Sequence, residues 1–323
     1  MLRFVLILGL SLLSTLASGV ASADNPPFKE WLANIQAQAR VDGVSESTIA
    51  MLNDLEPDPR VLKFDKSQPE FTQTFEEYLA ARVTQYRIDT AKKYYAEHRD
   101  VIDYAVDAPY LVAFWGIESN FGQYQGKYSI IRSLATLGHD ERRSAFFTKE
   151  LMTALKILDE GHIEPDKFVG GWAGAMGQNQ FLPSSFLNYA QDYDKDGRKN
   201  IWSDTSDVWA SIANYLKKNG WRQNSSWGTA VTLSAPIDFE ALRPAKVKSG
   251  CHQFFGKDWR KKGVTVPESL TGKFAMVIPE EGETNAYLVG PNFRGILAYN
   301  CANKYAVSVG LLADHIAQSV KPL

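Results

Sequence analysis

One glutamate follows a long apolar stretch of this sequence. Residues 109–117 have the sequence PYLVAFWGI, Glu118 comes next, and the polar, glycine-containing segment 119–122 follows. An apolar run without a polar face predicts a helix buried inside the fold. Burial disfavours the charged form of a carboxylate and raises its pKa, which suits a general acid that protonates a leaving group. The segment alone equally allows a structural glutamate that hydrogen-bonds its neighbours.

A second segment with chemical potential lies further along the chain. Residues 172–185 have the sequence WAGAMGQNQFLPSS, in which glycines precede three consecutive amide side chains. Glycine lets a backbone approach a ligand closely, and amides offer paired donors and acceptors to hydroxyl and acetamido groups. Glycine-rich polar loops are common, so this segment by itself does not identify a ligand.

The elements that must position these residues are mostly helical. Periodic patterns predict helices within 28–107, over about 144–160 with Gly161 as C-cap, after Ser206 as N-cap, and over about 303–320. Prolines break the first region at 57–59 and 68–69. Short strands are predicted at 229–233, 275–278 and 286–289. The expected fold class is therefore mainly α, with a minor β element (α+β).

Several ordered motifs together carry a family resemblance. These are residues 114–122, 133–137 and 173–185, followed by Trp202, 213–216, 220–221, 291–294 and 299–300. The chain resembles the lytic murein transglycosylases of the membrane-bound B type, in the lysozyme-like superfamily. The resemblance implies a lysozyme-like catalytic core with an added helical region and a small β element. We expect one catalytic unit over 24–323, made of a helical N-terminal region (24–107), a core (108–225) and a small α/β region with the closing helix (226–323).

The resemblance also implies a reaction. Enzymes of this family cleave the β-1,4 bond between N-acetylmuramic acid and N-acetylglucosamine in peptidoglycan and form a 1,6-anhydro ring. Glu118 matches the family's catalytic glutamate, which acts first as acid and then as base. Most glycosidases need two carboxyl groups, whereas no second acid lies in the Glu118 motif. Two alternatives stay open: a hydrolytic muramidase and a non-catalytic glycan-binding protein of the envelope.

Other matching positions indicate the walls of a glycan cleft. Gln180 matches a cleft glutamine of the family, and Tyr215, Tyr299 and Asn300 match residues beside it. Each tyrosine is equally well interpreted as a core aromatic with a satisfied hydroxyl. Ser119 either orients the neighbouring glutamate or caps a helix end. One departure is visible, because the family's Tyr-Asn-x-Ser pattern is Tyr-Asn-Cys-Ala over 299–302.

An acidic loop offers ligands of the kind that calcium prefers. Asp192, Asp194 and Asp196 occupy positions one, three and five of an EF-hand pattern, with Gly197 at position six and Asn200 at position nine. The alternative is a solvated turn between two helices. The family resemblance favours the metal site, because related enzymes carry calcium in the matching loop.

The end of this loop departs from the pattern. Position twelve is Ser203 rather than a bidentate glutamate, so closure of a calcium site would fall to Asp204 or Asp207. We therefore expect weak, structural binding of Ca²⁺ by Asp192, Asp194, Asp196 and Asp207. The glycan chemistry expected of Glu118 requires no cofactor.

The beginning of the sequence and its composition indicate a compartment. Residues 1–23 combine Arg3, an apolar run and a final Ala-Ser-Ala, which is typical of a secretory signal peptide. No cysteine near the cut offers a lipid anchor, so we expect a soluble periplasmic protein. With 35 basic and 37 acidic side chains, nothing favours nucleic acid. The expected partners are peptidoglycan strands and proteins of cell-wall synthesis or hydrolysis.

The chain has two cysteines, Cys251 and Cys301. An oxidising compartment permits a disulfide between them. Their spacing fits no metal motif, and two small buried residues are the alternative.

Overall fold

We analysed a computed structural model of the 323-residue chain. It describes residues 26–65, 72–98, 106–233, 254–255, 259, 264–267, 274–278 and 285–319. The expected signal peptide, residues 1–23, lies outside the described residues. Within the described part, no helix combines the length and the apolar character needed to cross a bilayer.

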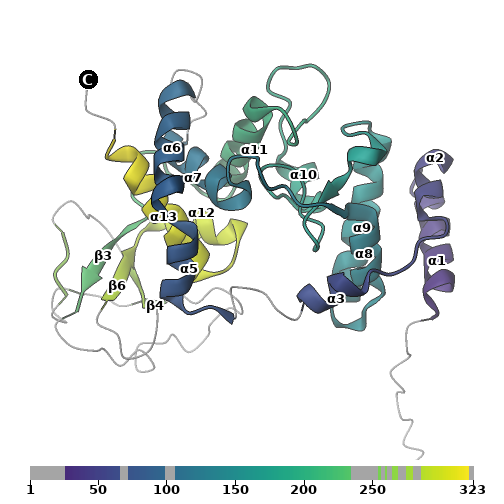
Figure 1. Ribbon diagram of the computed structural model, residues 1–323, viewed down its shortest axis with the longest axis horizontal. Helices are drawn as coiled ribbons and strands as arrows, with labels where there is room; N and C mark the ends of the chain where they lie inside the picture. Colours follow the sequence, from purple (N-terminus) through teal and green to yellow (C-terminus); the bar gives the residue numbers. More distant parts are fainter. Residues whose placement is uncertain are drawn as a thin grey trace, which may run out of the picture.

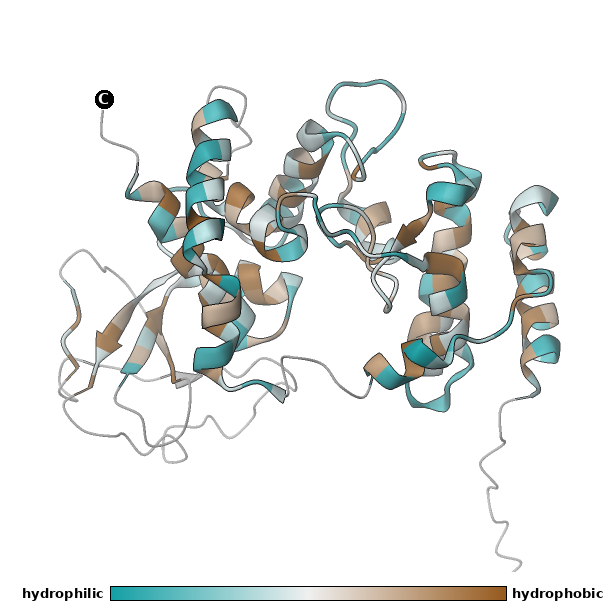
Figure 2. Ribbon diagram, in the orientation of Figure 1, coloured by the Kyte–Doolittle hydropathy of each residue, from teal (hydrophilic) through white to brown (hydrophobic). Residues whose placement is uncertain are grey.

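Helices dominate the described residues, as predicted. Those of the first part are α1 Phe28–Val41, α2 Glu46–Ile49, α3 Pro59–Asp65, α5 Phe75–Arg82, α6 Gln85–His98 and α7 Ala108–Ser119. Those of the second part are α8 Ile130–His139, α9 Ser144–Asp159, α10 Pro183–Tyr189, α11 Thr205–Lys218, α12 Pro291–Tyr299 and α13 Asn303–Ala317. Figure 2 shows hydrophobic and hydrophilic residues mixed along most of these helices, as expected when one face packs on a core.

Helix α7 lies at the centre of this arrangement. It packs against α6, α11 and α13, while α8 packs against α9. Figure 1 shows α5, α12 and α13 beside the larger sheet at one end of the molecule, and α1 and α2 beside α8 and α9 at the other. Seven consecutive residues of α7, from 110 to 116, are buried. The prediction of a buried helix at 109–117 is confirmed.

The end of α7 is fixed by its local sequence. Asn120 adopts the left-handed conformation (φ 49°, ψ 53°), and its N–H donates to the carbonyl of Gly116 at 3.1 Å. A Cβ atom at Gly116 would lie 2.8 Å from the ring of Phe121, so only glycine lets this ring fold back over the helix. The helix therefore stops one residue after Glu118 and leaves that glutamate at its end.

Two antiparallel sheets accompany the helices. The strands are β1 Tyr128–Ser129, β2 Val169–Gly170, β3 Gly228–Thr232, β4 Phe254–Phe255, β5 Ala275–Val277 and β6 Asn285–Val289. Strand β1 pairs with β2, and the larger sheet has the order β3-β6-β5-β4. Gly228 lies opposite Val289, and Thr232 lies opposite Asn285. Strands β3, β5 and β6 confirm the three predicted strands.

One helix start differs from the prediction. Ser206 was expected to cap the helix that follows the acidic loop, but α11 begins at Thr205 and Asp204 is its N-cap. The Asp204 carboxylate accepts the N–H of Ser206 at 2.7 Å and that of Asp207 at 3.3 Å. An acidic cap also interacts favourably with the positive end of the helix dipole.

Candidate active site

A tyrosine from the closing helix contacts the carboxylate of Glu118. The Tyr305 hydroxyl, on α13, donates a hydrogen bond to Oε1 of Glu118. Tyr305 is 3% exposed, and its ring centroid lies 6.3 Å from that of Phe114, one turn before the glutamate. Burial first, and then the negative charge of Glu118, raise the pKa of Tyr305 well above its usual value. Tyr305 therefore stays a neutral donor, while Glu118 itself is only partly buried.

Tyr299, at the end of α12, also lies near the end of α7. Its ring centroid is 4.8 Å from that of Phe114, and its hydroxyl donates to the Asn179 carbonyl at 2.5 Å. Burial, with a further contribution from the Glu118 charge, raises the pKa of Tyr299 well above 10. Tyr299 thus connects the carboxylate region to the glycine-rich loop.

Tyr215 supports Tyr299 from α11. The two ring centroids are 4.7 Å apart, and the Tyr215 hydroxyl donates to the carbonyl of Ala298 at 2.5 Å. Burial raises the pKa of Tyr215 to about 12. Both predicted tyrosines therefore lie next to each other, with each hydroxyl bonded to a backbone carbonyl.

The glycine-rich loop is fastened to α7 through Gln178. The Trp115 indole N–H donates to Oε1 of Gln178 at 2.7 Å, and Nε2 of Gln178 donates to the Trp202 carbonyl at 3.0 Å. A Cβ at Gly122 would come within 2.4 Å of the same Gln178 oxygen, so the turn after Glu118 also depends on a glycine. This network holds the loop and the glutamate-bearing turn in one arrangement.

Gln180 lies two residues further along and adopts a positive φ of 49°. Its Nε2 donates to the carbonyls of Gln125 at 3.1 Å and Gly177 at 2.8 Å. A Cβ at Gly171 would lie 3.3 Å from Oε1 of Gln180, which shows where the acceptor end of this side chain points. Gln180 therefore presents an oxygen from a side chain held by its own amide nitrogen.

Ser119 and Asn300 occupy the ends of two helices. Ser119 is buried; its hydroxyl donates to the Trp115 carbonyl at 3.3 Å and accepts the N–H of Gly122 at 2.9 Å. Of the two roles considered for Ser119, these bonds correspond to capping the helix end. Asn300 is half-buried at the C-terminal end of α12, and its N–H donates to the carbonyl of Ile296.

Glu150 is the fully buried glutamate among the described residues. It lies on α9, and its Oε2 accepts the backbone N–H of Ser184 at 2.8 Å, at the start of α10. Such a carboxylate satisfies a helix N-terminus. Glu150 is therefore accounted for by a structural contact.

The acidic loop brings three carboxylates together. Oxygen atoms of Asp192, Asp194 and Asp196 lie within 4.8 Å of one another. The loop backbone turns around these carboxylates. The N–H of Gly197 donates to Asp192 at 2.9 Å, and the φ of Gly197 is +93°. Oxygen ligands in such a set suit Ca²⁺.

Asp207 lies behind this loop. It is 1% exposed, and its two oxygens accept the N–H groups of Tyr193 and Asn200, each at 2.6 Å. Burial raises the pKa of Asp207 to about 6. Ser203, at position twelve of the loop, exchanges hydrogen bonds with Asn200.

Cys301 is disulfide-bonded. The other cysteine of the sequence, Cys251, lies outside the described residues.

Sequence reasoning missed Tyr305. It lies 187 positions from Glu118, in a helix whose apolar pattern explains an aromatic residue without any function. The sequence feature that could have indicated Tyr305 is its position six residues after Tyr299, because the two residues flank the joint between α12 and α13.

Comparison with protein families gives one match over nearly the whole chain. The family model described as "Transglycosylase SLT domain" matches residues 27–314. The membrane-bound lytic murein transglycosylase B of Escherichia coli (strain K12) is 32% identical over 218 residues, which make up 66% of this chain and 58% of that protein. The match therefore spans less than two thirds of the length of this curated relative.

Solved structures share the fold. SltB3 from Pseudomonas aeruginosa, in complex with NAG-anhNAM-pentapeptide, is 37% identical with a TM-score of 0.80, covering 92% of this chain and 82% of that chain. The Escherichia coli lytic transglycosylase Slt35, in complex with calcium, is 24% identical with a TM-score of 0.74, covering 92% of this chain and 94% of that chain. The mainly helical, lysozyme-like fold class expected from the sequence is confirmed.

Proposed function

Because the chain belongs to the transglycosylase SLT domain family, we propose that it cleaves the glycan strands of peptidoglycan as a lytic transglycosylase. The observation that carries the proposal is the carboxylate of Glu118 at the end of the buried helix α7, with the Tyr305 hydroxyl bonded to one of its oxygens. The structure of the related SltB3 was solved with a peptidoglycan fragment that contains an anhydro sugar. An anhydro sugar is the kind of product that this reaction forms.

Glu118 performs both proton transfers in this proposal. The protonated side chain donates to the oxygen of the leaving N-acetylglucosamine, so the bond between that oxygen and C1 of N-acetylmuramic acid breaks. The resulting carboxylate then takes the proton of the C6 hydroxyl of the same muramoyl residue. The C6 oxygen bonds to C1, which closes the 1,6-anhydro ring without water.

Tyr305 determines which oxygen of Glu118 carries the proton. Its hydroxyl donates to Oε1, so we propose that the proton on Glu118 resides on Oε2 and that Oε2 is the oxygen that serves the reaction. The hydrogen bond also stabilises the carboxylate form that must accept the second proton. We therefore assign Tyr305 as a positioning residue.

The surrounding residues would bind the sugars. We propose that Gln180 offers its side-chain oxygen to an acetamido N–H or a hydroxyl, and that Asn300 and the ring edges of Tyr215 and Tyr299 line the same cleft. Ser119 supports the turn rather than the substrate in this proposal, because its hydroxyl bonds to backbone groups.

Product analysis separates this reaction from hydrolysis by a muramidase. Digestion of purified sacculi followed by mass spectrometry should give muropeptides that end in 1,6-anhydromuramic acid. Products that are heavier by one water and carry a reducing end would favour the muramidase. Binding of sacculi without any release of fragments would favour a glycan-binding protein instead.

We also propose that the acidic loop holds Ca²⁺ in a structural role. The donor set fits, since three carboxylates lie within 4.8 Å of one another. Asp192, Asp194 and Asp196 would be the ligands, and Asp207 would hold the loop backbone in place. The ion, when bound, neutralises the mutual repulsion of these carboxylates. The proposed cleavage uses no step at this loop.

The site of action follows from the substrate. We propose that residues 1–23 direct export and that the protein works in the periplasm, where peptidoglycan strands are its partner. Cell fractionation tests this location. Proteins of cell-wall synthesis or hydrolysis are further partners that we propose; co-purification from envelope extracts tests them.

A further inference from the structure

A histidine joins the turn after α9 to the segment that follows the acidic loop. His162 lies two residues beyond Glu160, the C-cap of α9, and its side chain is 11% exposed. Its Nδ1 accepts the backbone N–H of Lys199 at 3.2 Å, and its Nε2 lies 3.3 Å from Oε2 of Glu160. Because Nδ1 is an acceptor, the single ring proton resides on Nε2 and is donated to Glu160. This arrangement therefore requires the neutral imidazole.

The His162 ring packs on helix α10. Its centroid lies 5.3 Å from that of Phe186, and the Lys199 ammonium lies over the same Phe186 ring at 5.9 Å. Arg198 and Glu164, 3.7 Å apart, form an exposed ion pair between the same two segments. Helix α10 packs against both α9 and α11, and Figure 1 shows it between them. These contacts hold the imidazole opposite the Lys199 N–H.

The segment 199–202 connects this histidine to the glycine-rich loop. The Ile201 carbonyl accepts the backbone N–H of Gln178 at 2.8 Å, and the Trp202 carbonyl accepts Nε2 of Gln178 at 3.0 Å. Gln178 in turn accepts the indole N–H of Trp115, on α7, at 2.7 Å. A shift of segment 199–202 therefore moves the hydrogen-bond partners of the loop that borders the proposed active site.

Protonation of His162 is incompatible with the contact to Lys199. The second proton goes onto Nδ1, so a ring N–H then faces the backbone N–H of Lys199 and neither group can accept the other. The imidazolium also gains a positive neighbour in the Lys199 side chain, whereas its Nε2–H keeps Glu160 as partner. Protonation therefore breaks the bond to segment 199–202 and leaves the bond within the turn after α9 intact.

The titration of His162 has a definite direction. Burial lowers the pKa of His162 below its usual 6.5; the charges of Glu160 and Asp192 oppose this shift, and the charge of Lys199 adds to it. The folded protein thus binds this proton less tightly than the unfolded chain does. The stability that the neutral ring contributes is therefore complete well above pH 6.5 and is lost as the pH falls through that value.

We propose that His162 is a pH-sensitive switch that fastens segment 199–202 when it is neutral and releases it when it is protonated. The switch goes beyond the proposed function, because cleavage by Glu118 requires only that the glycine-rich loop be in place. Its effect on activity rests on that function: in acidic surroundings, release of the segment slows cleavage without altering a reacting group. Burial raises the pKa of Asp207, which accepts the Asn200 N–H, to about 6, so a test must separate the two residues.

Three variants make this separation, since Asp207 is unchanged in all of them. His162→Asn places an amide oxygen near the position of Nδ1, so it keeps an acceptor for the Lys199 N–H but does not titrate. His162→Phe keeps a ring on Phe186 and removes the acceptor. His139→Asn is the matched control, because His139 is also half-buried but its Nε2 contacts the Pro26 carbonyl at 2.8 Å, and protonation preserves that bond.

Hydrogen–deuterium exchange measures the switch without any substrate. Wild type and variants are compared with each other at about pH 7.5 and at about pH 5, on either side of the usual histidine pKa. The calcium concentration is the same at both pH values. Peptides that cover 199–202 and 172–182 report on the switch, and a peptide from α9 serves as reference. Release of fragments from sacculi under the same conditions reports on activity.

At the lower pH we expect 199–202 to exchange about 5- to 10-fold faster in the wild type than in His162→Asn, the effect of one lost hydrogen bond. Residues 172–182 should follow, and the wild type should release fragments more slowly than His162→Asn. At the higher pH the two proteins should match. His162→Phe should exchange fast at both pH values, and His139→Asn should respond to pH as the wild type does.

Equal exchange in wild type and His162→Asn at the lower pH would overturn the switch. Wild-type exchange in His162→Phe at the higher pH would overturn it too, because the Lys199 N–H would then not depend on the ring. His162→Gln, with a longer acceptor, repeats the comparison if the asparagine variant melts early. Absence of fragment release from every protein would refute the proposed function, while the exchange rates would still decide the switch.

Discussion

Replacing Tyr305 by phenylalanine removes one hydroxyl and keeps a ring that is 3% exposed and packed near Phe114. The fold should therefore persist. The lost interaction is a hydrogen bond to a carboxylate, and such bonds contribute about 1.5–3 kcal/mol. Since about 1.4 kcal/mol corresponds to a factor of ten in rate, kcat/KM should fall by about 10- to 100-fold.

The substitution should also change the pH dependence of the reaction rate. Without its donor, the charged form of Glu118 is less stable, so the side chain keeps its proton to higher pH. The resting enzyme must be protonated to act as acid, and its rate falls as the pH rises through the protonation midpoint. In Tyr305→Phe this alkaline limb should move to higher pH.

Release of soluble muropeptides from labelled sacculi, measured at several pH values, gives both quantities. Tyr110→Phe is the control, because Tyr110 is also buried at the α7 core but its hydroxyl accepts the N–H of Trp227 at 3.3 Å. The control should keep the rate and the pH profile of the wild type. If Tyr305→Phe also kept both, the positioning role of this hydroxyl would be refuted.

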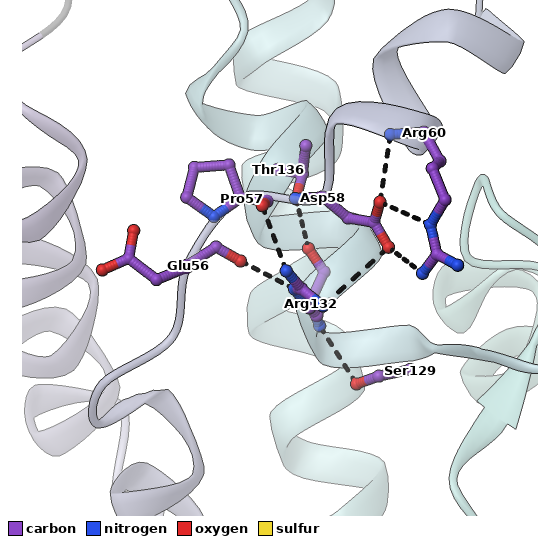
Figure 3. Close-up of polar contacts among 7 residues, drawn as sticks. All are labelled: Glu56, Pro57, Asp58, Arg60, Ser129, Arg132 and Thr136. Atoms are coloured by element: carbon purple, nitrogen blue, oxygen red, sulfur yellow. Dashed lines mark hydrogen bonds and ion pairs between the residues drawn. The ribbon is translucent and has the colours of Figure 1, made fainter.

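Three further predictions concern stability. The hydrogen bond with Arg60, drawn in Figure 3, lowers the pKa of Asp58 to about 2. The contribution of the ionised Asp58 carboxylate to the free energy of unfolding is therefore complete above about pH 4 and is lost as the pH falls toward 2. Because Arg60 is largely exposed, Asp58→Asn should cost about 1 kcal/mol in urea unfolding at pH 7 and less at pH 3; equal stability at pH 7 would contradict this. Gly116→Ala should lower the free energy of unfolding by about 1–3 kcal/mol, because the new methyl group meets Phe121 at 2.8 Å; an unchanged urea midpoint would speak against the tight contact. Millimolar Ca²⁺ should raise the melting temperature of the wild type but not that of Asp194→Asn; no shift in the wild type would rule out the site.

Local patterns in the sequence predicted the helices and strands well where one physical cause dominated. The run at 109–117 has no polar face that could be exposed to solvent, so the sequence predicts a buried helix. Helix α7 is that helix, and it lies at the centre of the fold. The strands around Val231, Met276 and Leu288 alternate or cluster apolar residues between turn signals, and they pair as β3, β5 and β6. In each case the deciding information lies within a few neighbouring residues.

Helix starts depended on competition between neighbours. Ser206 was predicted as the N-cap, but Asp204, two residues earlier, is an equally good N-cap residue type. In the structure the carboxylate of Asp204 reaches two N–H groups, while the Ser206 hydroxyl contacts Asp204 itself. The predicted and observed N-caps of α11 therefore differ by two residues, because the earlier of two suitable cap residues is used.

Contacts between distant segments were beyond local patterns. Tyr305 meets Glu118 only because α13 packs along α7. In the same way, Phe64 lies near Trp172 while ionic contacts join the start of α3 to Arg132 on α8 and its end to Arg142 in the turn after α8. Periodicity identifies which face of a helix is buried, but it does not say which residue of another helix will lie opposite.

The central claim is that one carboxylate performs both proton transfers. Clearance of purified sacculi by Glu118→Gln, compared with wild type at equal concentration and with matched melting temperatures, tests it most directly. Glutamine keeps the size of the side chain and its bond from Tyr305 but can neither donate nor accept the proton. We predict that the variant still binds sacculi and releases no anhydromuropeptides above background. Release at the rate of the wild type would show that Glu118 is not the catalytic acid.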